Sequence, residues 1–513
     1  MGRIKKVLIG VFISIVMLSN NVLADTVKDI NGKEAFGQSE QVDIEFADGK
    51  LLEKNYEVAG VVDDESLFNE GVVSLNSNFM DNDLISSEEF LADDMENSEF
   101  VEFDLILKES ADLDEFIQCV YEISEEISIS LIEEIGLIHV KLPSRMTKEE
   151  FLNASSIQPY VELYGEMPDM EMPQAPLNAI DFNTTIGRII PRTRSVETDL
   201  FDTMAWHVDE VTSDGESLQI SQGDGIKIAI IDSGIDYNHP ILSGKIDTLT
   251  SKSFVTGELD VSDKNGHGTA VAGIIAQIAP EATLTSYKVI GESTGDSEWT
   301  IEALIQAVDD RNNIINMSLG TYKCIDVDSE NMTILAFERA VEYAEAKECI
   351  VVASAGNSSL NLDHYFETEH IKHLPGSIAG VITVSATNGN YLASYSNYGT
   401  EIDICAPGGD LVYEGEYIDL SKWIYCLYPT TMDNGLSAYG IPQGYSFSYG
   451  TSLSAPTVSA ALADIWAMDV NMGTQETISY LKNGATDLGA IGNDIQFGAG
   501  EINIKASLDL VAN

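Results

Sequence analysis

A series of short, almost wholly apolar runs in the second half of the chain constrains its fold more than any other feature. Runs of this kind are typical of strands that are buried on both faces. They occupy residues 227–231, 284–289, 314–318, 350–354 and 381–385. Segments with helical spacing, at 267–277 and 301–308, separate the first of them. Strands alternating with helices predict an α/β fold, a mostly parallel sheet with helices on both faces and functional groups at the strand ends.

Residues 99–165 carry a different pattern, which predicts a small α+β domain. The expected strands are 101–107, 128–132, 137–142 and 160–164, and the expected helices are 112–125 and 147–157. The order strand–helix–strand–strand–helix–strand is that of a ferredoxin-like sandwich. In the third strand Ile138, Val140 and Leu142 share one face. His139 is therefore expected to face solvent and to have no catalytic role.

The N-terminal residues 1–24 predict a secretory signal peptide. A basic start precedes the apolar stretch 7–18, and small residues lead to cleavage after Ala24. No later stretch is long and apolar enough to span a membrane, so we expect a secreted protein. Residues 25–98 are acidic and weakly periodic, and we expect a largely disordered leader.

Residues 166–199 are rich in Pro and Met and predict a linker between the small domain and the domain at 200–513. Arg188, Arg192 and Arg194 lie within it, although the chain has few arginines. Two interpretations remain open. The cluster is a processing site, or it is a solvated basic patch that pairs with the acidic domain.

The net charge of −57, from 27 basic and 84 acidic residues, excludes nucleic acid as an expected partner. A cationic peptide would be attracted, although the simpler interpretation, which we prefer, is that the charge only keeps a secreted protein soluble. The cysteines also leave two interpretations open. If Cys119 leaves with a removed segment, the other four can form two disulfides, or they are buried thiols. These four are Cys324, Cys349, Cys405 and Cys426.

Three segments place a reactive side chain beside glycines at the end of a strand or the start of a helix. Asp232 precedes Ser233-Gly234, His267 lies between two glycines, and Ser452 follows Gly450-Thr451. Each alone is explained by a turn, a polar contact or a helix cap. Together they supply the nucleophile, the base and the orienting carboxylate of acyl transfer. Asn357, after a buried strand, would donate to the oxyanion together with the Ser452 N–H.

The four segments, in the order Asp, His, Asn, Ser, resemble those of the subtilase family over residues 200–513. The resemblance implies a subtilisin-like fold and a serine endopeptidase with the triad Asp232, His267 and Ser452. It also implies that residues 99–165 are an inhibitory propeptide. Substrate contacts would come from Ser318, Leu319 and Gly320 by strand pairing, from Gly356 in the pocket for the side chain before the scissile bond, and from Thr451 at the oxyanion site.

The resemblance implies no required cofactor and no catalytic metal. Relatives with a high-affinity calcium site have an aspartate after His-Pro, where this chain has Ile241, so we expect that site to be absent. Weak calcium binding elsewhere stays open. We expect a monomer whose partners are its propeptide and a peptide or protein substrate.

Residues 205–212 and 316–322 are similar to lantibiotic leader-processing proteases, which often cut after arginine. The stretch 372–375, which covers the base of the expected pocket, has no acidic residue, although Asp363, Glu367 or Glu369 could reach it. Two alternatives remain: a general degradative subtilisin, and a catalytically silent subtilase that serves as a binding module.

Overall fold

The computed structural model describes most of the chain from residue 100 onward. The described ranges are 100–170, 204–291, 295–414, 417–437 and 441–513. They belong to one compact unit, Glu88–Asn513. The predicted signal peptide, the acidic leader and the three arginines of the linker lie outside the described residues.

The central sheet is mostly parallel, as predicted. Its strands are β6 (Lys227–Asp232), β7 (Lys252–Ser253), β8 (Thr283–Lys288), β10 (Ile314–Met317), β12 (Ile350–Ser354), β14 (Val381–Asn388), β15 (Tyr391–Leu392) and β16 (Ile404–Pro407). The order is β15-β14-β12-β10-β6-β8-β7, and β16 also pairs with β14. Every pairing is parallel except β14 with β15. The buried apolar runs therefore form adjacent strands whose carboxyl ends lie along one edge.

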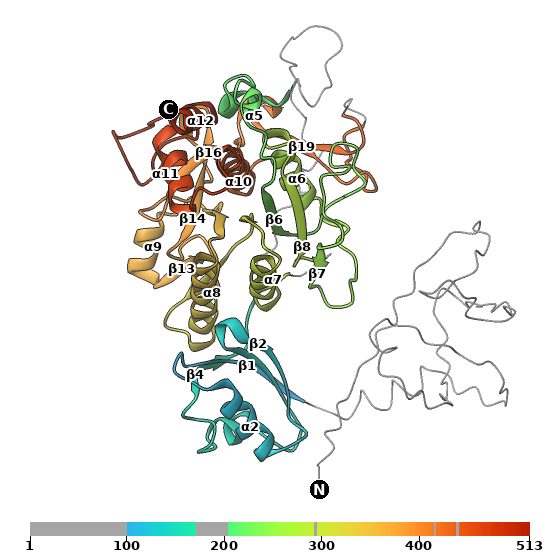
Figure 1. Cartoon of the computed structure of the whole chain (residues 1–513), viewed down its shortest axis with the longest axis vertical. Coiled ribbons are helices and arrows are strands. Elements are labelled where there is room, and N and C mark those ends of the chain that lie inside the picture. The colour runs from blue at the N-terminus through green and yellow to red at the C-terminus, as the bar shows by residue number, and fades with distance from the viewer. Residues whose placement is uncertain (1–99, 171–203, 292–294, 415–416, 438–440) are drawn as a thin grey trace, which may run out of the picture. The chain divides into compact units, whose positions relative to one another are not determined.

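Helices cover both faces of this sheet because successive side chains of each strand enter different cores. Ile228 and Ile230 of β6 pack into the core that contains α6 (His267–Ile278) and α10 (Thr451–Met468). Ala229 and Ile231 pack into the core that contains α7 (Ser297–Asp309) and α8 (Asp328–Ala346). Figure 1 shows α7 and α8 beside each other, and they are in contact.

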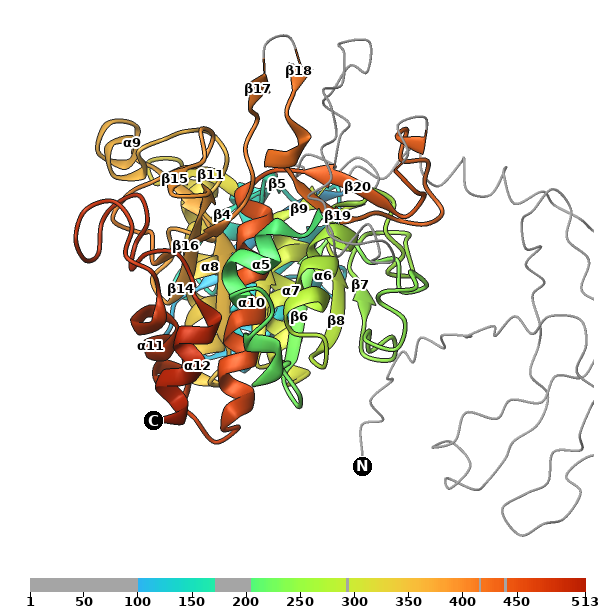
Figure 2. The same cartoon turned by 90° about the horizontal axis from the view of Figure 1, so that it is seen from above.

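Shorter elements complete this part of the chain. They are α5 (Trp206–Thr212), η3 (Ser217–Gln219), β9 (Gly295–Asp296), β11 (Thr321–Cys324), α9 (Leu362–Glu369), β13 (Ile371–Leu374), β17 (Tyr413–Glu414), β18 (Tyr417–Ile418), η4 (Leu420–Lys422), β19 (Ile424–Leu427), β20 (Tyr445–Ser448), α11 (Thr474–Gly484) and α12 (Ile504–Ala512). β17 and β18 pair as an antiparallel hairpin that projects from the helices in Figure 2. β11 pairs with β13, and this small ribbon lies next to the site described below.

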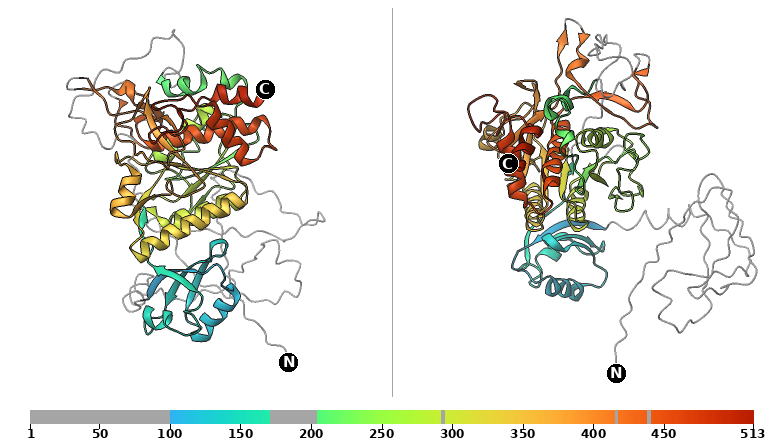
Figure 3. Two further views of the ribbon diagram at one scale, coloured as in Figure 1. Left: turned by 90° about the vertical axis from the view of Figure 1, so that its left-hand side faces the viewer. Right: turned by 45° about the horizontal axis from the view of Figure 1, so that its top comes forward.

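Residues 101–165 form a separate antiparallel sheet. Its elements are β1 (Val101–Leu107), α2 (Leu113–Ile123), β2 (Ser128–Ile132), η2 (Glu133–Ile135), β3 (Leu137–Leu142), α3 (Lys148–Leu152) and β4 (Val161–Gly165). The strand order is β2-β3-β1-β4, and Figure 3 shows the helices of this segment lying beside its sheet. Both helices pack their buried side chains into one core with the strands. α3 begins at the predicted cap, Thr147, but ends five residues earlier than expected. There the side chain of Asn153 donates to the Glu149 carbonyl and caps the last turn.

The small sheet packs against α8 of the main unit. Arg339 of α8 donates from Nη1 to the carbonyls of Leu107, at 2.7 Å, and Ile135, at 2.9 Å, and its Nη2 lies 2.7 Å from the Glu162 carboxylate. The chain then continues into β5 (Asp169–Met170), which pairs with β9. The segment expected to be a linker therefore begins with an ordered strand on the surface of the main unit.

The prediction that His139 faces solvent is wrong. Its Nδ1 lies 2.8 Å from Oδ1 of Asp104, and only 29% of its side chain is exposed. Glu298, near the start of α7, completes a group whose ligand atoms lie within 4.8 Å of one another. The alternation of β3 correctly separated its two faces, but on the polar face His139 lies beside Asp104 and Glu298 of α7, whereas the Lys141 side chain stays 42% exposed.

All five cysteines lie in the described ranges and are free thiols. Cys349, Cys405 and Cys426 are buried, and burial raises the pKa of Cys349 and Cys426 to about 12. Of the two interpretations of the cysteines, the structure therefore favours buried thiols, and these three behave as small apolar residues.

Candidate active site

Asp232 and His267 meet where β6 ends and α6 begins. Asp232 is the last residue of β6, and His267 is the first residue of α6. The imidazole Nδ1 lies 2.8 Å and 3.0 Å from the two carboxylate oxygens of Asp232. Both side chains are at least 98% buried. The carboxylate can therefore fix the tautomer of the ring that carries hydrogen on Nδ1 and leaves Nε2 free to accept a proton.

The pKa of His267 reflects opposing influences. Burial lowers it, but the charge of Asp232 and its hydrogen bond, with a contribution from the charge of Asp263, raise it above the ordinary value. Nε2 of His267 is buried and has no hydrogen-bond partner among the described residues. A hydrogen bond from the Ser452 hydroxyl to this nitrogen is therefore not formed in this structure. The imidazole is therefore oriented by Asp232, and its Nε2 is free to act as a general base.

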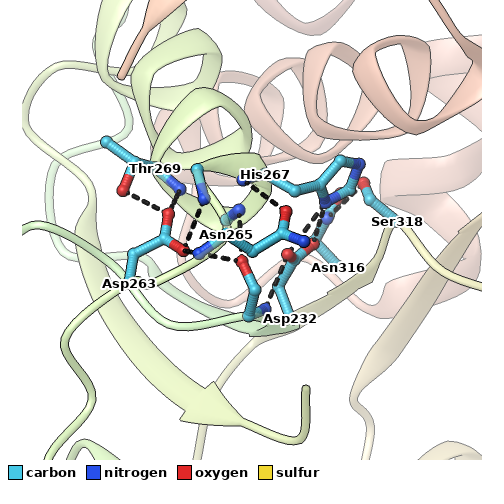
Figure 4. A network of polar contacts seen from close by, with 10 residues as sticks. Asp232, Asp263, Asn265, His267, Thr269, Asn316 and Ser318 are labelled. Carbon is cyan, nitrogen blue, oxygen red and sulfur yellow. Dashed lines mark hydrogen bonds and ion pairs between the residues drawn. The ribbon is translucent and has the colours of Figure 1, made fainter. Parts of the chain in front are cut away.

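A buried carboxylate that sequence reasoning missed holds the start of α6. Asp263 accepts hydrogen bonds from the N–H groups of Asn265, Gly266 and Thr269 and from the hydroxyls of Ser233 and Thr269 (Figure 4). Ser233 in turn accepts from the N–H of Gly268. Asp263 thus ties the loop after β6 to the first turn of α6. An acidic residue shortly before a helix was the only signal in the sequence.

Ser452 and Asn357 lie on either side of Gly450. Ser452 is the second residue of α10, and Asn357 follows β12. A Cβ atom at Gly450 would lie 3.1 Å from Oγ of Ser452 and 3.4 Å from Nδ2 of Asn357. Glycine at this position, with φ of +151°, keeps the space between the hydroxyl and the amide open. The structure therefore brings these two predicted residues together.

Thr451 orients the amide of Asn357. Its backbone N–H and its hydroxyl are 2.9 Å and 2.8 Å from Oδ1 of Asn357, and both donate to it. The Thr451 hydroxyl also accepts from the N–H of Gly356 at 3.1 Å. These bonds occupy the oxygen of the amide and direct its NH₂ group away from Thr451. The arrangement suits donation to an anion at the N-terminus of α10.

The predicted substrate residues Ser318, Leu319 and Gly320 follow β10 as a segment without strand pairing in the described structure. Ser318 is buried, and its hydroxyl accepts from Nδ2 of Asn316, whose Oδ1 accepts from Ser459 of α10. Figure 4 includes Asn316 and Ser318 in the same polar network as His267. The side chain of Ser318 thus links this segment to Asn316 and, through it, to α10. The backbone of residues 318–320 makes no strand pairing with the described residues and could pair with a substrate.

Other charged residues considered from sequence lie elsewhere. Asp363 accepts hydrogen bonds from the N–H and the hydroxyl of Thr400, and Glu367 and Glu369 are exposed on α9. His239 is buried, with Nε2 2.9 Å from the Gly444 carbonyl, and Ile241 donates its N–H to Nδ1 of this ring. No helix within the described ranges has both the length and the apolar character needed to cross a bilayer.

Comparison with known proteins identifies relatives of this chain. The subtilase family (Peptidase_S8) matches residues 223–500. The nisin leader peptide-processing serine protease NisP of Lactococcus lactis subsp. lactis is 33% identical over 307 residues, which are 50% of this chain and 43% of that protein. The epidermin leader peptide-processing serine protease EpiP of Staphylococcus epidermidis is 27% identical over 401 residues, 65% of this chain and 84% of that protein. The match thus spans less than half of the first relative and most of the second.

Solved structures that resemble this chain also include proteases of lantibiotic-type peptides. The crystal structure of a lanthipeptide protease superimposes with a TM-score of 0.57 at 34% identity and covers 60% of this chain and 94% of that one. The structure of EpiP from Staphylococcus aureus covers 81% of this chain and 99% of that chain with a TM-score of 0.65. At 24% identity this second likeness concerns the fold alone.

Proposed function

Since the chain belongs to the subtilase family and is a serine-type peptidase, we propose that Asp232, His267 and Ser452 form its catalytic triad. Ser452 Oγ attacks the peptide carbonyl, and His267 Nε2 takes the hydroxyl proton and later gives it to the leaving amine. Asp232 stabilises the imidazolium that forms. The single observation that carries the proposal is the buried His267–Asp232 hydrogen bond, beside an Nε2 with no partner among the described residues.

The acyl-enzyme forms through a tetrahedral oxyanion between Ser452 and Asn357. Asn357 Nδ2 and the N–H of Ser452 donate to this oxygen, and Thr451 holds the amide in place. The backbone of Ser318, Leu319 and Gly320 pairs with the substrate as an added strand. Gly356 lines the pocket for the side chain before the cleaved bond. The reaction needs no cofactor.

A fluorophosphonate probe tests the triad directly. The probe should label the wild-type chain at Ser452 and should fail to label Ser452→Ala. Ser359→Ala is a matched control, because the hydroxyl of this exposed serine near Asn357 bonds only to the Ser394 carbonyl in the described contacts. Labelling of Ser452→Ala at another residue would refute the assignment. A wild-type chain that is not labelled even after its linker has been cut would be the silent binding module.

The chain is made, in this proposal, as a secreted precursor inhibited by its own segment 99–165, a ferredoxin-like propeptide. The hydrogen bonds of Arg339 to the small sheet and the pairing of β5 with β9 support stable binding of this segment to the main unit. Cleavage in the linker, near 192–195, then releases the peptidase. The Ser452→Ala precursor should accumulate uncut, and normal maturation of that variant would refute self-processing.

The substrate is a peptide leader of the lantibiotic type, a proposal that rests on the printed activities of the relatives NisP and EpiP. The net charge of −57 supports a cationic peptide. General degradation is the second candidate, because an alkaline elastase of Bacillus sp. strain YaB is 29% identical over 349 residues. Broad cleavage of casein by the purified enzyme would favour the second candidate, and a single cut in a leader peptide the first. The enzyme acts as a monomer without the high-affinity calcium site.

A further inference from the structure

We propose that His373 closes the pocket for the substrate side chain before the scissile bond, so that this enzyme cuts after small, uncharged residues. The inference rests on the proposed function, because it takes Gly320 and Gly356 as the walls of that pocket. His373 fills the space between these two glycines and so limits the size of the substrate side chain that the pocket can accept.

The imidazole of His373 lies between the two glycines. A Cβ atom at Gly320 would come within 2.4 Å of Nε2 of His373, and one at Gly356 would come within 3.0 Å of the same atom. The ring itself is buried, with 3% exposure. The two backbone segments that flank the expected pocket therefore both pack against one ring, and little depth is left for a long side chain.

The ring packs against Tyr322 of β11, and the hydroxyl of Tyr322 is bonded in turn to the loop after Ser396. His373 pairs with Tyr322 across the β11–β13 ribbon, and the two ring centroids are 5.0 Å apart. The Tyr322 hydroxyl accepts from Nδ2 of Asn397 at 2.8 Å and donates to Oγ of Ser358 at 3.0 Å. A large substrate side chain would have to displace the buried His373 ring from its packing against the bonded Tyr322, so we expect such a side chain to be excluded.

The described residues that line the pocket also provide no negative charge to pair with a cationic substrate side chain. Burial lowers the pKa of His373 to about 4, so the ring is neutral at physiological pH. The other atoms nearest to a Cβ at Gly356 belong to the Asn397 amide and the Tyr322 hydroxyl. Of the three acidic residues that the sequence placed nearby, Asp363 is bonded to Thr400, and Glu367 and Glu369 are exposed on α9. An arginine would therefore lose its hydration without gaining an ion pair.

Peptides that differ only in the residue before the cleaved bond test the inference. The matured wild-type enzyme should cleave the alanine peptide with a kcat/KM at least tenfold above those of the phenylalanine and arginine peptides. Preference for arginine or phenylalanine would overturn the inference even without a variant.

His373→Gly assigns the effect to the ring. It should raise kcat/KM for phenylalanine relative to alanine about tenfold or more, whereas His364→Gly, at an exposed histidine on α9, should leave the ratio unchanged. An unchanged ratio in His373→Gly would overturn the role of this residue. His373→Asn, which retains polarity with less volume, gives an intermediate ratio and serves if the glycine variant does not fold. Fluorophosphonate labelling of Ser452 in each protein separates failure of this inference, with labelling intact, from failure of the proposed function, with labelling lost.

Discussion

At the scale of single residues, Asn357 permits a sharp prediction, because its two amide atoms have separate tasks. Oδ1 is occupied by Thr451, and Nδ2 is the proposed oxyanion donor. Asn357→Ala should lower kcat about 10²–10³-fold and change KM little. Asn357→Asp keeps an acceptor for Thr451 but loses the N–H, so it should lose at least as much. Steady-state kinetics measure both parameters. A wild-type kcat in the alanine variant would contradict the proposed role of Asn357 in stabilising the oxyanion.

The sequence alone singled out the residues of the proposed triad, and the structure joins two of them, Asp232 and His267, by a hydrogen bond. Asp232, His267 and Ser452 stand beside glycines in short segments that can be recognised without a structure. Asp263 and His373 could not be found in this way, because what matters is which loop or strand lies opposite them. An aspartate before a helix and a histidine in a short strand have ordinary local explanations, and only the packed chain shows their partners.

At the scale of elements, the N-terminus of α6 depends on Asp263. Asp263→Ala would leave buried N–H and hydroxyl groups without partners, and we expect a loss of about 2–4 kcal/mol of unfolding free energy. Since His267 is the first residue of α6, labelling of Ser452 should slow as well. Asp260→Ala is the control, because this exposed aspartate bonds only to Ser262 in the described contacts. Urea unfolding measures the difference, and equal midpoints for the two variants would contradict the prediction.

The sequence predicted the environment of a strand correctly where both faces are apolar and buried. It failed for β3, whose environment depends on a helix from another part of the chain. β10, β12 and β14 begin at the predicted residues because a run that is apolar on both faces has one possible environment. β3 was also placed correctly, but its polar face was assigned to solvent. Polar residues on a strand indicate water or a polar partner equally well, and here His139 bonds to Asp104 of β1 with Glu298 of α7 nearby.

At the scale of the whole molecule, the group Asp104, His139 and Glu298 links the small sheet to the main unit. Burial, together with the charge of Asp104, raises the pKa of Glu298 to about 7. The hydrogen bond to Asp104 outweighs burial and raises the pKa of His139. Further charged groups act on these two: Glu102, Asp296 and Glu302. Asp104 and His139 lie on the paired strands β1 and β3 of the small sheet, so their hydrogen bond persists when the sheet separates from the main unit. The raised pKa of Glu298 is the shift that depends on association, and it means that the associated form holds this proton more tightly than the separated form.

Association of the small sheet should therefore weaken as the pH rises. The contribution of Glu298 is fully present below its ordinary pKa near 4.5 and is lost as the pH passes about 7, where a second buried charge appears beside Asp104. We expect binding of the cut segment to be about tenfold or more weaker at pH 8 than at pH 5.5.

The Ser452→Ala precursor allows this equilibrium to be measured, because trypsin can cut its linker at Arg188, Arg192 or Arg194 while the enzyme itself stays inactive. Size-exclusion chromatography then gives the fraction of residues 100–170 that remains bound at each pH. Glu298→Gln, which cannot become charged, should retain the segment at pH 8, whereas Glu302→Gln, on the exposed side of α7, should release it like the parent. Retention that is independent of pH in the parent, or identical release from the Glu298→Gln variant, would show that these buried acids do not control the contact.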